Sequence, residues 1–181
     1  MSDILVYIYK QPLSRIIYCI PIIVLVWAFL MFLLRKQRLP VRILNSVFCL
    51  IAFIAIIFVT LFRGEGQRGN PVLLPLYSLI KAQRQKEMYR TLLMNVLLFV
   101  PLGLTMPFAL PERWPCRALI SIVIATTLSI YVESAQFIFR LGRTEIDDVL
   151  MNTFGAVLGI LAYFPTWVWK KVKGSDMKET I

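Results

Sequence analysis

Three polar residues lie at helical spacing near the end of a long apolar run: Glu133, Gln136 and Arg140. Residues three and four apart share one face of an α-helix, so these side chains project from the same side. An ionised carboxylate at hydrocarbon depth costs at least about 2.5 kcal/mol, so Glu133 must face protein, water or a ligand, or become protonated. Glu133 is therefore a candidate acid/base group. The alternative is an ion pair with an arginine that locks two helices together.

The polar loop that follows ends in two carboxylates at the predicted start of another helix. Asp147 or Asp148 would meet the free backbone N–H groups and the positive dipole end of that helix. Capping explains one of the two, and the other is a further candidate acid/base group. Asp148 and Asn152 share a face that continues to Gly155 and Gly159, a small-residue packing pattern. The polar side of this helix is thus predicted to be its contact side.

Two earlier residues complete the set, because Arg90 precedes an apolar run and Asn95 lies one turn into it. These helix ends are predicted to meet on one membrane side, in a shallow, outward-opening pocket. The candidate acid/base groups are Glu133, Asp147 and Asp148, and the candidate binding groups are Arg90, Asn95, Gln136, Arg143 and Asn152. Two guanidinium groups suit phosphate or carboxylate recognition, because arginine offers a bidentate fork. Pairs of carboxylates would equally suit a divalent cation.

The order and spacing of these residues resemble the VanZ-like family. The segments that carry the resemblance are Asn95 to Gly103, Glu133 to Phe137, Gly142-Arg143, Asp147 to Val149 and Asn152 to Ala156, preceded by Asn70-Pro71 and Leu74 to Leu76. The resemblance covers about residues 70–160, and Leu76 stands where the family pattern has Phe. The family is named for a membrane protein associated with teicoplanin resistance. The resemblance therefore implies a cell-envelope membrane protein that lowers the access of glycopeptides to their targets, and it implies no established reaction.

The elements that position these residues are apolar runs. Hydrophobic residues make up 59% of the 181 residues and charged residues 17%, whereas soluble domains carry about a quarter charged residues. Runs of ~20 apolar residues cross a hydrocarbon layer of ~30 Å. We therefore predict an all-α integral membrane protein, a single VanZ-like domain over residues 1–181 with about five transmembrane helices. Their predicted ranges are 13–34, 43–62, 91–110, 118–139 and 148–169, with a re-entrant or interfacial segment between the second and third.

Composition also excludes several classes of site. The net charge of +10 comes from basic residues at the ends of apolar runs, where they contact lipid headgroups rather than nucleic acid. The absence of histidine excludes His-based zinc sites and Ser–His or Cys–His catalysis, and no cysteine spacing matches a metal site. The sequence names no metal-ligand set and leaves the cofactor unknown. Basic clusters at 35–42 and 170–173 predict a cytoplasmic C-terminus and an external N-terminus.

Three functions follow as expectations. The first is binding or processing of an anionic amphiphile: a lipid-linked wall precursor, a phospholipid or a glycopeptide. In an enzyme, the carboxylates would transfer protons, the two arginines would clamp the anion and the amides would position these groups. The second is a non-enzymatic membrane scaffold joined by the same polar network. The third is a transporter or flippase that couples to protons through Glu133, which about five helices without an internal repeat disfavour.

Overall fold

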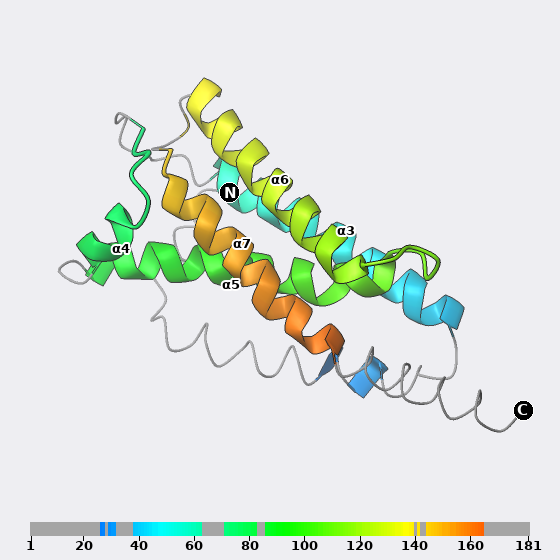
Figure 1. The fold of residues 1–181 in the computed structure, drawn as a ribbon. Helices are drawn as coiled ribbons and strands as arrows, with labels where there is room; N and C mark the ends of the chain where they lie inside the picture. Colours follow the sequence, from blue (N-terminus) through cyan, green and yellow to red (C-terminus); the bar gives the residue numbers. More distant parts are fainter. Residues whose placement is uncertain are drawn as a thin grey trace, which may run out of the picture.

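The computed structural model describes residues 26–27, 29–31, 38–62, 71–82, 86–139, 141 and 144–164 (Figure 1). Its helices are α3 (Arg38–Phe62), α4 (Tyr77–Ala82), α5 (Lys86–Ala109), α6 (Arg117–Phe139) and α7 (Ile146–Ile160), followed by the 3₁₀ turn η1 (Leu161–Tyr163). The one β-type pairing within these ranges is an isolated bridge between Val72 and Glu145. The prediction of an all-α protein is confirmed.

Three helices are long and apolar enough to cross a membrane: Leu39–Thr60, Met88–Ala109 and Arg117–Phe139. They correspond to the second, third and fourth predicted helices, and the chain is an all-α integral membrane protein. Helices α3 and α5 each begin five residues before the predicted start, because helical geometry continues into their polar first turns.

The other two predicted helices are described only in part. The first, 13–34, lies mostly outside the described residues. The last begins at Ile146, two residues before its predicted start, and gives way to η1 after Ile160. Fifteen α-helical residues rise about 22 Å, less than the ~30 Å hydrocarbon layer. The number of five transmembrane helices therefore stays a prediction.

Helix α5 lies at the centre of the bundle and packs against α3, α4, α6 and α7. Its contact with α7 is very close, because Gly103 faces the backbone of Ala156 and Gly155 faces the backbone of Val96. A Cβ atom at either glycine would overlap a carbonyl oxygen of the other helix. Gly159 also faces α5, so the predicted small-residue packing face of this helix is confirmed.

Among the described residues, the two ends of the bundle differ in the charged side chains that they hold. At the first, the acidic end, α3 and α6 end while α5 and α7 begin. It holds the buried side chains of Glu133, Glu145 and Asp147. At the second, the basic end, α3 and α6 begin while α5 ends. It holds the side chains of Arg42, Arg113 and Arg117. Alternating helix directions thus bring together polar residues that lie far apart in the chain (Figure 1).

Candidate functional site

The acidic end is closed by residues 71–78, here called the 71–78 segment, which lies beside the start of α7 (Figure 1). The backbone N–H of Val72 donates to the carbonyl of Thr144 at 2.9 Å, and the N–H of Ile146 donates to the carbonyl of Val72 at 3.1 Å. These two bonds make the Val72–Glu145 bridge. The segment that precedes α4 is therefore joined to the residues that precede α7.

Asp147 holds the same segment through both of its carboxylate oxygens. Oδ1 accepts the backbone N–H of Leu76 at 2.6 Å, and Oδ2 accepts the backbone N–H of Ser78 at 2.7 Å. The side chain is 1% exposed. Leu76 adopts a left-handed conformation with φ of 64°, which costs an L-residue about 1–2 kcal/mol. The two charge-assisted bonds offset that cost.

Glu145 and Glu133 extend the network from Asp147 toward α6. The hydroxyl of Ser78 donates to Oε2 of Glu145. The backbone N–H of Glu145 donates to Oε2 of Glu133 at 3.2 Å, and both carboxylates are buried. Asp147 and Glu145 thus hold the 71–78 segment directly, and Glu133 of α6 joins them through the backbone of Glu145.

The amides predicted to bind a ligand make contacts between helices. Nε2 of Gln136 donates to the carbonyl of Thr60 at 2.9 Å, which joins the end of α6 to the end of α3. Nδ2 of Asn152 donates to Oγ of Ser129 at 2.8 Å across the α6–α7 interface. Oδ1 of Asn152 accepts no hydrogen bond within the described part of the chain, although the side chain is 3% exposed. One half of the Asn152 amide therefore remains available to a bound molecule.

Helices α5 and α7 supply the other described candidates. Arg90 is half-buried in the first turns of α5, and Asn95 is buried further along it. Asp148 is half-buried in the first turn of α7, and its backbone N–H donates to the carbonyl of Glu145 at 3.1 Å. The eighth predicted residue, Arg143, lies outside the described residues. The structure thus places seven of the predicted residues in the acidic half of the bundle, and their roles stay predictions.

The hydrogen bonds of Asp147 favour a role in fixing the 71–78 segment over a role in proton transfer. A carboxylate whose two oxygens both accept backbone N–H bonds is held in one orientation by the chain itself. As for a cation, no group of three or more His, Cys, Asp or Glu side chains in the described ranges is arranged to hold a metal ion. The candidate site therefore consists of three hydrogen-bonded buried carboxylates, with Arg90, Asn95 and Asn152 in the same half of the bundle.

Two residues of the network were not singled out from the sequence, Ser78 and Glu145. Glu145 could have been predicted from the sequence, because it is a carboxylate close to a predicted helix start, as Asp147 is. Ser78 could not have been predicted, because its role depends on the 71–78 segment folding back onto α7.

Comparisons with known proteins agree with the motifs. The profile of the family described as VanZ/LLP1 matches residues 15–169. Among curated proteins, the chain is similar to Protein VanZ of Enterococcus faecium, with 36% identity over 75 residues. The aligned part is 41% of this chain and 45% of that protein, so it spans less than half of either. No solved structure matches the chain significantly.

Proposed function

Because this chain belongs to the VanZ/LLP1 family, we propose that it is a cell-envelope membrane protein that binds an anionic amphiphile at its acidic end and so contributes to glycopeptide resistance. The ligand is a lipid-linked wall precursor, a phospholipid or the glycopeptide itself. The family match and the three membrane-capable helices support the setting. The similarity to Protein VanZ supports the link to resistance.

The observation that carries the proposal is a polar cluster next to an apolar surface at one membrane end. Arg90 and the amides of Asn95 and Asn152 belong to the same half of the bundle as the buried carboxylates. The neighbouring 71–78 segment exposes Leu73 and Leu74 by 67% and 68%. An amphiphile needs both kinds of surface, with polar contacts for its headgroup and apolar contacts for its chain. Ionisable side chains within membrane-spanning segments are also candidate functional groups, because their burial in lipid is costly.

An anion can bind next to three carboxylates if their charge is already compensated. The carboxylates of Asp147 and Glu133 accept backbone N–H groups, and that of Glu145 accepts the hydroxyl of Ser78. These bonds draw the negative charge toward the protein's own donors. Arg90 then supplies the positive charge, and its planar fork suits a phosphate or carboxylate headgroup.

The competing function is a membrane scaffold without a ligand. The observation that favours it is that the hydrogen bonds of the carboxylates described above all join one part of this chain to another. Under this alternative, substitutions at the acidic end lower the yield of folded protein without a selective loss of ligand binding.

The test compares Arg90→Gln with Arg113→Gln, which removes the same charge at the basic end. Each variant is purified, checked by size-exclusion chromatography and titrated with a polyprenyl phosphate. Each is also expressed in a glycopeptide-susceptible bacterium for teicoplanin susceptibility. We expect Arg90→Gln to raise the Kd for polyprenyl phosphate about tenfold or more, since hydrogen bonds to charged groups contribute about 1.5–3 kcal/mol, and to lower resistance, while Arg113→Gln matches the wild type. A folded Arg90→Gln protein with wild-type binding and resistance would refute the proposal. A loss of folded protein alone would favour the scaffold.

A further inference from the structure

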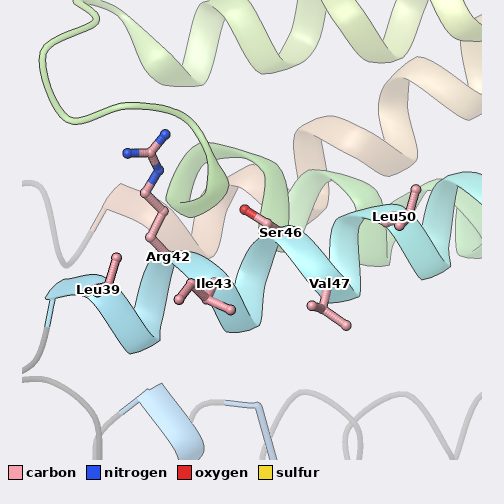
Figure 2. Close-up of a pocket in the computed structure, with 6 residues that line it drawn as sticks. All are labelled: Leu39, Arg42, Ile43, Ser46, Val47 and Leu50. Carbon is pink, nitrogen blue, oxygen red and sulfur yellow. The ribbon is translucent and has the colours of Figure 1, made fainter.

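A shallow groove runs along the first half of α3, at the basic end of the bundle and away from the site described above (Figure 2). Its volume is about 420 Å³, and its lining residues are Leu39, Arg42, Ile43, Ser46, Val47 and Leu50. Residues four apart form ridges along a helix. One ridge here is Leu39, Ile43 and Val47, and the other is Arg42, Ser46 and Leu50, so the groove between them follows the helix axis.

Arg42 places a positive charge at the membrane end of this groove. It lies three residues inside the apolar stretch Leu39–Thr60, about 5 Å from its end, so its long side chain reaches the headgroup level. Its Nε donates to the carbonyl of Ala109 at 3.3 Å, and the side chain is exposed. That bond holds the guanidinium in place while its two terminal nitrogens extend away from α3 (Figure 2).

Ser46 lies one turn deeper, on the same side of α3 as Arg42 (Figure 2). Hydroxyl side chains in membrane helices usually donate to the carbonyl four residues earlier. Ser121, Ser134, Thr60 and Thr105 all do so here. Ser46 makes no hydrogen bond within the described part of the chain, although it is exposed at hydrocarbon depth. Its hydroxyl is therefore free to donate to an acceptor outside the chain.

We propose that this groove binds an anionic phospholipid, whose phosphate is held by Arg42 and Ser46 and whose acyl chain lies along Ile43, Val47 and Leu50. Arg42, which lines the groove, supplies the complementary charge for such a headgroup. Arginine binds phosphate through two parallel N–H bonds. Arg42 lies about 27 Å along α3 from Thr60, which contacts the acidic end. This lipid therefore occupies the other leaflet and is not the ligand of the proposed function.

The test measures phospholipid binding by native mass spectrometry of the full chain in detergent. The probes are phosphatidylglycerol and phosphatidylcholine with identical acyl chains. We expect one preferred phosphatidylglycerol per chain, with phosphatidylcholine bound about tenfold more weakly. Arg42→Gln should raise the Kd for phosphatidylglycerol about tenfold. Val47→Trp fills the groove and leaves the Arg42–Ala109 contact intact, so it should weaken binding even if Arg42→Gln folds poorly.

The matched controls are Arg113→Gln, another arginine at the basic end, and Leu119→Trp, which enlarges an exposed side chain on α6. Both should bind phosphatidylglycerol as the wild type does. Wild-type binding by Val47→Trp would overturn the proposal. So would a disulfide-linked dimer of Val47→Cys that the wild type does not form, since a second copy would then cover the groove. Neither result bears on Arg90 or on polyprenyl-phosphate binding.

Discussion

Replacing Asp147 by Asn should release the 71–78 segment from α7. Asn presents one acceptor oxygen where Asp147 presents two, and its NH₂ group would face the N–H of either Leu76 or Ser78. One buried hydrogen bond is therefore lost and the other loses its charge assistance. The fold changes little elsewhere, because the helices are held by apolar contacts and by the close α5–α7 packing.

The two hydrogen bonds of Asp147 allow the size of this opening effect to be estimated. Hydrogen bonds to charged groups contribute about 1.5–3 kcal/mol each. Losing one of them and weakening the other costs about 3 kcal/mol in favour of the open segment. Since 1.36 kcal/mol is a factor of ten, the open population should rise by about two orders of magnitude. The left-handed Leu76 favours opening as well, because its backbone relaxes once the bonds to Asp147 are gone.

Limited trypsin digestion in detergent measures this opening. Lys81 lies in α4, directly after the 71–78 segment, and its peptide bond to Ala82 becomes accessible when the segment detaches. Cleavage follows the population of the open form when opening and closing are fast. Cleavage after Arg113, an exposed residue at the basic end, serves as the reference within the same digest. We expect the ratio of the two cleavage rates to rise about a hundredfold in Asp147→Asn.

A ratio within about twofold of the wild type, in protein that elutes as a folded species, would refute the reasoning. It would mean that the two bonds to Asp147 do not hold the segment. An equal rise of both cleavage rates would instead indicate global unfolding, and the claim that the effect is local would be wrong.

Two further predictions concern the bundle and its orientation. Gly155→Ala should lower the melting temperature in detergent sharply or abolish folding, because the added Cβ would overlap the Val96 carbonyl. Leu158→Ala, on a more exposed face of α7, should lower the melting temperature little. Equal melting temperatures for the two variants would contradict the close α5–α7 contact. Cys116 is exposed in the α5–α6 connection, which the basic clusters of the sequence predict to be cytoplasmic. A membrane-impermeant maleimide should therefore label it only after permeabilisation, with Cys116→Ser as control. Labelling of intact cells that this control abolishes would show that the predicted orientation is wrong.

Much of the helical framework follows from the sequence alone. The runs that become α3, α5 and α6 are long and apolar, and a chain in lipid must satisfy its backbone groups within each helix. The pairing of Gly155 with Gly159 likewise predicted which face of α7 packs closely. These are local properties, because helix formation and the position of a side chain on a helix depend only on near neighbours.

The site itself depended on the tertiary structure. The partners of Asp147 are the backbone N–H groups of Leu76 and Ser78, about seventy residues away, and the partner of Gln136 is the carbonyl of Thr60. Backbone donors and acceptors are the same at almost every residue, so no residue type marks which of them a distant side chain will choose. The sequence determined which side chains are too polar to face lipid, and the folding back of the 71–78 segment decided where they find their hydrogen bonds.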